Sequence, residues 1–309
     1  MANIVLLDQA VISTNSLAGA ACAFGVFDGF HRGHQFLIEQ TIMDARRNDA
    51  QSTIATFDID PDELFAHDKL VKLSRNEERI KTLSRSGVDN VVVFHFTKDF
   101  AALSSEDFLE RAFAPSTPAS VHVGSDFRFG FKAAGDLSVL KTWGDRHGMR
   151  VIGHDLEYDM GKPITATRIR ELLATGSGLR EANELLGHPY RMGGRVEGGR
   201  HEGREFGFRT ANVAVEKNLH ALAQGVYAAY TTIDGNWYKA AVSVGVSPTF
   251  ADRTNAYCEA HILDFNGDLY DRTITLDFIE YLQPMRKFES KEELIDTVMG
   301  YITWVRNNL

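Results

Sequence analysis

The chain has 309 residues, of which 44% are hydrophobic and 24% are charged, which is the composition of an ordinary soluble globular protein. Its formal net charge of −9 disfavours a general nucleic-acid binder, since such proteins are usually basic, and local basic spots point to small anionic ligands instead. No apolar stretch reaches the roughly 20 residues of a membrane helix and the amino terminus lacks the basic start of a signal peptide, so we expect a cytoplasmic protein without a membrane partner.

The first half of the sequence alternates short apolar runs with amphipathic segments. Strands are predicted at residues 4–7, 21–27, 53–57, 91–96, 120–124 and 151–153. Helices are predicted at residues 35–47, 76–86, 105–113 and 137–147. This alternation indicates an α/β domain with a parallel sheet covered by helices. Ligands of such sheets bind outside the carboxyl ends of the strands.

The turn after the second predicted strand, residues 28–34, reads D-G-F-H-R-G-H and precedes a helical pattern. A helix start favours anions, because its backbone N–H groups are free and the helix dipole is positive there. His31 and His34 are three residues apart, so both imidazoles can face one phosphate. Gly33 between them lets a phosphate approach the backbone. The turn therefore predicts a phosphate site; the alternative is two surface histidines.

Two further segments of the first half carry polar groups at predicted strand or helix ends. Residues 124–130, G-S-D-F-R-F-G, place an acid, a base and two aromatic rings in one turn. The rings suit a flat ligand, although an ordinary loop with an Asp–Arg pair is the alternative. Residues 164–170, I-T-A-T-R-I-R, open a helix with hydroxyls and two arginines. They predict a second anion site or, alternatively, simple helix caps.

The sequence changes character near residue 184, so we predict domains at 1–183 and 184–309. Residues 194–204 are rich in glycine and arginine, which predicts a phosphate-cradling loop or, alternatively, a flexible hairpin. Strands are predicted at residues 225–233, 237–246, 257–265 and 273–280, separated by turn sequences. They indicate an antiparallel sheet or small barrel, followed by a helix that Ser290 and Glu293 cap. The two cysteines, Cys22 and Cys258, lie in apolar runs and predict buried free thiols of a reducing compartment.

In order and spacing, these motifs resemble those of prokaryotic bifunctional riboflavin kinase/FAD synthetase. The resemblance rests on F-D-G-x-H-x-G-H at residues 27–34, G-x-D-F-R-F-G at 124–130 and T-x-T-x-I-R at 165–170. It continues through residues 207–212, G-F-R-T-A-N, and 257–265, Y-C-E-A-H-I-L-D-F. It implies a Rossmann-like nucleotidyltransferase domain, then an antiparallel β-barrel riboflavin kinase domain with a C-terminal helix.

For the first domain, the resemblance implies transfer of AMP from ATP to FMN. His31 and His34 would contact the ATP phosphates and the charge that develops at the α-phosphorus, which agrees with the need of adenylyl transfer for positioned donors. Nucleotide or phosphate contacts in this domain are implied for Gly25, Phe27, Asp28, Gly29, Gly33, Thr167 and Arg168. Flavin contacts are implied for Asp126, Phe127 and Arg128.

For the second domain, the resemblance implies phosphorylation of riboflavin by ATP. Thr210 and Asn212 would supply oxygen ligands to Mg²⁺, and Glu259 would accept the proton of the riboflavin 5′-hydroxyl. Nucleotide contacts are implied for Gly194, Gly199, Arg204 and Gly207. The expected partners are riboflavin, FMN, FAD and ATP or ADP, with Mg²⁺ as cofactor, and the sequence does not predict an oligomeric state.

Several positions depart from the family pattern, among them Ser247 in S-P-T-F at residues 247–250, where the family has N-P-T-F. Arg209 stands in place of the proline of P-T-A-N, Asp60 in place of a histidine and Ala166 in place of a serine. Proline would fix the backbone beside the metal ligands, whereas arginine loosens it and adds a charge. Two alternatives to the bifunctional enzyme therefore stay open: only the adenylyltransferase is active beside a degenerate kinase, or the chain is a flavin-binding regulator without turnover.

Overall fold

The computed structural model describes residues 1–7, 16–66, 71–198, 209–216, 218–220, 222–246 and 256–309. Contacts divide the chain into two compact units, Met1–Ala166 and Thr167–Leu309. The segment 167–183, which we expected to belong to the first domain, therefore packs with the second unit. The predicted boundary between residues 183 and 184 divides the chain by function rather than by packing, and it stays a prediction.

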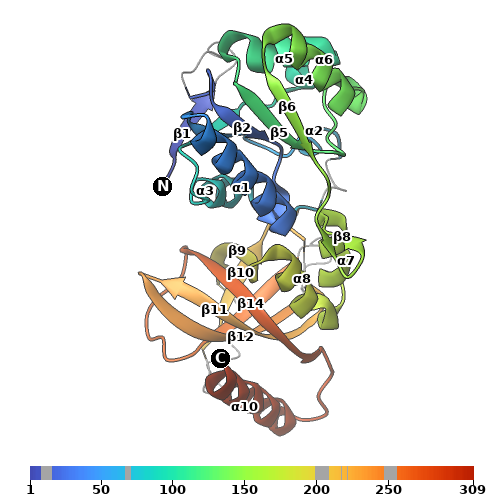
Figure 1. Cartoon of the computed structure of the whole chain (residues 1–309). Helices are drawn as coiled ribbons and strands as arrows, with labels where there is room; N and C mark the ends of the chain where they lie inside the picture. The colour runs from blue at the N-terminus through green and yellow to red at the C-terminus, as the bar shows by residue number, and fades with distance from the viewer. Residues whose placement is uncertain (8–15, 67–70, 199–208, 217, 221, 247–255) are drawn as a thin grey trace. The chain divides into compact units, whose positions relative to one another are not determined.

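The first unit is built on a sheet in which, among the described residues, six strands run parallel in the order β1-β4-β3-β2-β5-β6 (Figure 1). The strands are β1 (Asn3–Leu7), β2 (Ala21–Phe24), β3 (Ser52–Phe57), β4 (Asn90–Phe94), β5 (Ser120–Gly124) and β6 (Arg150–His154). The chain adds strands on one side of β2 first and on its other side afterwards. Sheets of this kind bind ligands where the direction reverses, which is at the carboxyl ends of β2 and β5 here.

Helices cover both faces of this sheet, as predicted for an α/β domain. The longer ones are α1 (Arg32–Arg47), α3 (Asn76–Leu83), α5 (Ser105–Phe113) and α6 (Leu137–His147). Short elements complete the unit: η1 (Asp28–Phe30), α2 (Glu63–Ala66), α4 (Lys98–Ala101), η2 (Ala114–Ser116), η3 (Phe131–Ala133), β7 (Tyr158–Asp159) and β8 (Lys162–Pro163). The ranges of α5 and α6 are those predicted from the sequence, because Ser104 and Asp136 cap them with side-chain hydrogen bonds.

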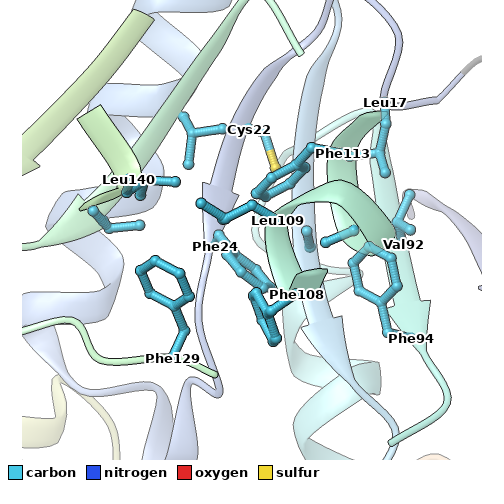
Figure 2. Packing of buried hydrophobic residues seen from close by; sticks show 14 of the residues in the cluster. Leu17, Cys22, Phe24, Val92, Phe94, Phe108, Leu109, Phe113, Phe129 and Leu140 are labelled. Carbon is cyan, nitrogen blue, oxygen red and sulfur yellow. The ribbon is translucent and has the colours of Figure 1, made fainter. Parts of the chain in front are cut away.

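Alternate residues of each strand point to opposite faces, so the unit has two hydrophobic cores. Ala23 and Ile54 pack with α1 and α3 on one face. On the other face, Phe24 lies among rings that include Phe108 and Phe113 of α5, as Figure 2 shows. Each fully buried phenylalanine contributes about 1.5–3 kcal/mol to stability, so this aromatic cluster anchors α5 to the sheet.

Two predicted boundaries near the first motif were wrong. Strand β2 ends at Phe24 rather than at residue 27, because Phe27 has a left-handed backbone with φ of 64° that ends the extended chain. Helix α1 begins at Arg32 rather than at residue 35. The histidine motif thus forms the first turn of the helix itself, which places it at the helix N-terminus as predicted.

The second unit contains a closed antiparallel barrel, which confirms the predicted β-barrel (Figure 1). Around it, the strands follow the order β10-β13-β12-β11-β14-β9. Their bounds are β9 (Tyr190–Glu197), β10 (Ala211–Val215), β11 (Gly225–Ile233), β12 (Asn236–Val246), β13 (Ala256–Ile262) and β14 (Thr273–Pro284). The predicted turn between β11 and β12 forms with positive φ at Asp234 and Gly235, the conformation of a tight hairpin.

Helices flank the barrel on its outer surface. Before it lie α7 (Ala166–Leu173), η4 (Gly176–Gly178) and α8 (Leu179–Leu186), and α10 (Lys291–Asn308) follows it. Ser290 caps α10 by accepting a hydrogen bond from the Glu293 N–H, as the sequence predicted. Ile302 and Val305 of this helix pack on the barrel. Both cysteines are buried free thiols as predicted.

Candidate active sites

In the first unit, the turn after β2 is held by the carboxylate of Asp28. Its two oxygens accept hydrogen bonds from the backbone N–H groups of Leu73 and Ser74 at 2.9–3.0 Å, and Oδ1 also accepts one from the Ser74 hydroxyl at 3.1 Å. Gly29 has φ of +72°, and a Cβ there would lie 2.7 Å from Leu73. Asp28 and Gly29 therefore fix the shape of the turn, which accounts for these residue types at the two positions. Their predicted nucleotide contacts stay predictions.

The side chains of His31 and His34 lie against one another beyond this turn. Their rings stack with centroids 3.6 Å apart and an interplanar angle of 18°. A Cβ on Gly33 would lie 3.2 Å from Nδ1 of His31, so the glycine leaves room for this ring. The buried Phe27 meets the His34 ring edge-on, with centroids 5.3 Å apart. The predicted histidine pair thus forms, and Phe27 supports it from the core.

Desolvation favours the neutral form of His34. The pKa of His34 lies well below its usual value because the ring is desolvated and because a charge on His31 would repel a second one. Nδ1 of His34 is buried and has no hydrogen-bond partner among the described residues. The location of the pair at the N-terminus of α1 favours an anionic ligand beside it.

An arginine that the sequence analysis missed holds the neighbouring strand ends together. Arg79 of α3 is 2% exposed. It donates to the carbonyls of Val26 and Phe57, each at 2.8 Å, and to the Thr56 hydroxyl at 2.9 Å. It therefore links the segment after β2 to the end of β3. Arg79 occupies a helical pattern that reads as solvent-facing, so only the fold reveals this role.

Asp60, at the position of the family's histidine, lies close to this arginine and is 9% exposed. Burial raises the pKa of its carboxyl group, the negative charge of Asp28 raises it further and Arg79 opposes the change. A carboxylate here repels phosphates, whereas a histidine would attract them. The substitution therefore makes this side of the turn more acidic.

The predicted flavin segment follows β5. Asp126 and Arg128 are exposed, as side chains that contact a ligand must be. Phe127 is half-buried and packs against Phe24 and Phe129, with ring centroids 5.4 and 5.5 Å away. Phe127 therefore also belongs to the aromatic core, and the flavin contacts of all three predicted residues stay predictions.

Thr167 and Arg168 belong to the second unit. The guanidinium of Arg168 is 2.7 Å from the carboxylate of Glu181, within that unit. Their predicted role at the triphosphate stays a prediction.

In the second unit, strand pairing aligns four polar residues on the outer face of the barrel. Asn212 of β10 lies opposite Glu197 of β9 and opposite Glu259 of β13. Glu259 in turn lies opposite Ser243 of β12. Residues at the same register on neighbouring strands share one face, about 5 Å apart. The barrel therefore brings Asn212 and Glu259 together, as the resemblance implied.

Thr210 joins this row through a hydrogen bond of 2.7 Å from its hydroxyl to Oε1 of Glu259. Thr210 and Asn212 also line a pocket of about 520 Å³. Its other walls are Val196, Arg209, Ala211, Ala260–Ile262 and Asp264–Tyr270. Because the Thr210 hydroxyl donates a hydrogen bond to Glu259, the lone pairs on the hydroxyl oxygen are left for a cation. A hydroxyl and an amide oxygen beside a pocket fit Mg²⁺ that also binds nucleotide phosphates.

The glycine and arginine segment is only partly described. Gly194 lies in β9, and a Cβ there would be 1.8 Å from the carbonyl oxygen of Ala214 on β10. The close approach of β9 and β10 therefore requires glycine at this position. The phosphate contact predicted for Gly194 stays a prediction. Gly199, Arg204, Gly207 and residues 247–250 lie outside the described residues.

The comparisons with known proteins cover both units. A family model for FAD synthetase matches residues 13–168, and one for riboflavin kinase matches residues 186–309. A curated relative from Pseudomonas fluorescens, named bifunctional riboflavin kinase/FMN adenylyltransferase, is 33% identical over 278 residues, which are 89% of this chain and 88% of that protein. This chain belongs to the bifunctional riboflavin kinase/FMN adenylyltransferase family.

Other members of the family are similarly close. The Listeria monocytogenes protein of the same name is 32% identical over 276 residues, covering 88% of this chain and 87% of its own. Among solved structures, one named macrolide-efflux protein, from Streptococcus pneumoniae, is 29% identical with a TM-score of 0.86 and covers 98% of this chain and 99% of its own. In the described part of the present chain, no helix has the length and apolar character to span a membrane.

Proposed function

We propose that this chain makes FAD from riboflavin in two steps, each in its own unit. The second unit phosphorylates riboflavin with ATP to give FMN and ADP. The first unit joins AMP from a second ATP to FMN, and pyrophosphate leaves. The observation that carries the proposal is that both sets of side chains are assembled: the stacked His31–His34 pair at a helix start, and Thr210 hydrogen-bonded to Glu259 beside Asn212.

In the adenylyl transfer, a phosphate oxygen of FMN attacks the α-phosphorus of ATP and the bond to the β-phosphate breaks. No strong base is required, because the FMN phosphate is already an anion. His31 and His34 donate hydrogen bonds to the phosphate oxygens where negative charge increases. Burial keeps His34 neutral without ligand, and the phosphates of a bound nucleotide favour its protonated form.

In the kinase step, the 5′-hydroxyl of riboflavin attacks the γ-phosphorus of ATP and ADP leaves. Glu259 accepts the hydroxyl proton. Thr210 orients the carboxylate through its 2.7 Å hydrogen bond, so that Oε2 is left to take this proton. We propose that Thr210 and Asn212 hold Mg²⁺, which offsets the charge of the phosphates when it is bound.

We propose that Mg²⁺ in the adenylyl site arrives with the nucleotide. Among the described residues, no three His, Cys, Asp or Glu side chains cluster in a way that would hold a metal ion. A metal carried by phosphates needs only one or two protein ligands. ATP, Mg²⁺ and flavins are cytoplasmic, which agrees with the predicted location.

The proposal is tested by incubating the purified chain with riboflavin, ATP and Mg²⁺ and separating riboflavin, FMN and FAD over time. FMN should appear first and FAD should follow. FAD formed only when FMN is supplied would mean that the kinase is degenerate, and FMN without FAD would mean that the adenylyl site is inactive. Flavin binding without either product would support the regulator.

A further inference from the structure

His261 lies two residues after Glu259 on β13, beside the candidate kinase pocket, and was given no role by the sequence analysis. Its Nδ1 is 2.8 Å from the backbone carbonyl oxygen of Arg209. A carbonyl oxygen only accepts hydrogen bonds, so Nδ1 must carry the proton and donate it. The bond fixes which nitrogen of the ring is protonated and holds the chain at Arg209.

The carbonyl that His261 holds belongs to the peptide between Arg209 and Thr210. Thr210 is the residue that donates to Glu259 at 2.7 Å, and Asn212 follows in register with Glu259. The ladder between β10 and β13 begins only at the pair Ala211–Ala260. Thr210 therefore lies just outside the regular sheet. The bond from His261 to the Arg209 carbonyl holds this part of the chain against β13.

Arg209 makes a second connection across the pocket. Its Nη1 donates to the side-chain oxygen of Asn266 at 3.3 Å, and both residues line the pocket. This long bond between exposed side chains contributes little rigidity. Of these two contacts with described residues, the shorter bond from His261 to the backbone is the stronger constraint on Arg209, at the position where a proline would fix the chain by itself.

We propose that His261 is a positioning residue of the kinase site. By donating to the Arg209 carbonyl, it sets the position of Thr210 and Asn212 relative to Glu259, and so replaces the constraint that proline would supply. The inference rests on the proposed kinase function. This positioning role requires only an N–H donor at the position of Nδ1. Acid–base catalysis would instead require a ring that gains and loses a proton.

Three variants of the full chain test this role. His261→Asn keeps a donor at nearly the position of Nδ1, His261→Gln moves the donor outward to the position of Nε2, and His261→Ala removes it. His188 supplies a matched control, because its Nδ1 makes a comparable 2.9 Å contact to the carbonyl of Pro189 and it is not among the pocket-lining residues. The adenylylation of FMN by the same chain reports whether each variant folds.

The kinase rate is measured as a function of Mg²⁺ concentration at saturating riboflavin and ATP. We expect His261→Ala and His261→Gln to need about three- to tenfold more Mg²⁺ for half-maximal rate, which is the effect of losing one hydrogen bond. His261→Asn and His188→Ala should need the native concentration. Adenylylation should be unchanged in all four variants.

Hydrogen–deuterium exchange of residues 209–216 gives a readout without turnover. Mg²⁺ with ADP should slow exchange of this segment in the native chain and in His261→Asn, and should slow it less in His261→Ala. If the native kinase is active and His261→Ala matches it in both measurements, the positioning role is wrong. Loss of activity in His261→Asn as well would also contradict it, and would assign the ring a catalytic role. An inactive native kinase would instead overturn the proposed function.

Discussion

In the first unit, His31 and His34 are three residues apart in one helical turn, whereas in the second unit Thr210 and Glu259 are 49 residues apart and meet because β10 and β13 pair. The first site depends on local geometry: a left-handed Phe27, a turn held by Asp28 and a helix start. The second depends on strand register, which a slip of one residue would destroy. The two sites should therefore respond differently to the same kinds of change.

Their chemistry differs in the same way. The candidate adenylyl site holds two stacked imidazoles, and the candidate kinase site holds hydroxyl, amide and carboxylate oxygens of the kind that suit a hard cation. Histidine changes its charge near neutral pH, and burial lowers the pKa of His34 from its usual value. Each substitution in the two sites below changes one reaction and uses the other reaction, in the same molecule, as its control.

The largest effect is expected for Glu259→Gln, which removes the proton acceptor but keeps a group that Thr210 can hydrogen-bond. The kinase turnover number should fall by ~10²–10⁴-fold, the usual contribution of a general base, while FMN adenylylation is unchanged. Initial rates of FMN formation from riboflavin measure the first effect, and FAD formation from supplied FMN measures the second. A normal kinase rate would show that Glu259 is merely structural.

The next largest effect is expected for His34→Ala. Adenylylation should fall by ~10²-fold or more, because one donor to the transition state is lost, and riboflavin phosphorylation should be unchanged. His147→Ala is a matched control, since His147 lies in the last turn of α6 and contacts the Trp143 carbonyl at 2.8 Å. An adenylylation rate that survives in His34→Ala would remove the histidine pair from the mechanism.

Acidification should weaken the first unit by a moderate amount. Burial lowers the pKa values of His34 and His122 in the fold, and His122 lies in a polar chain, 3.2 Å from Asp44 and 2.9 Å from His154. The unfolded chain therefore takes up more protons below pH 6.5 than the folded unit does. Stability should be complete above about pH 6.5 and fall below it, by at most about 1.4 kcal/mol for each pH unit and each such histidine, until the pH passes the lowered pKa of that histidine in the folded unit.

This pH effect is measured by urea unfolding at pH 7.5 and 5.5 in a chain with Trp237 and Trp304 replaced by phenylalanine. Trp143, in the core of the first unit, is then the remaining tryptophan and reports that unit alone. His122→Asn should reduce the difference between the two pH values. Equal stability at both would mean that the buried histidines do not control the unit.

The smallest effect is expected for Arg209→Pro. Proline keeps the carbonyl that accepts from His261 and adds its own restriction, worth about 0.4–1 kcal/mol where the backbone is compatible. The kinase turnover number should rise by about two- to fivefold, the factor that this free energy gives, and adenylylation should not change. A slower kinase would mean that the Arg209 side chain is itself part of the site.

The sequence predicted best what is encoded locally. The histidine turn, helices α5 and α6 and the cap at Ser290 depend on residues within a few positions of one another, so their patterns are visible in the chain. Arg79 and His261 were missed because their partners are distant in sequence: Val26 for Arg79, and the Arg209 carbonyl for His261. The resemblance gave Thr210 and Glu259 separate roles in one domain, and the hydrogen bond between them was not predicted, since periodicity cannot give the register of two strands.

The most direct test of the two-site account uses two variants with supplied intermediates in parallel assays. The His34→Ala chain, given riboflavin, ATP and Mg²⁺, should accumulate FMN at the native rate and make almost no FAD. The Glu259→Gln chain should make FAD from supplied FMN, ATP and Mg²⁺ at the native rate, and should leave riboflavin unchanged when riboflavin is supplied instead. If either single variant loses both activities while remaining folded, the two reactions share one site and the account is wrong.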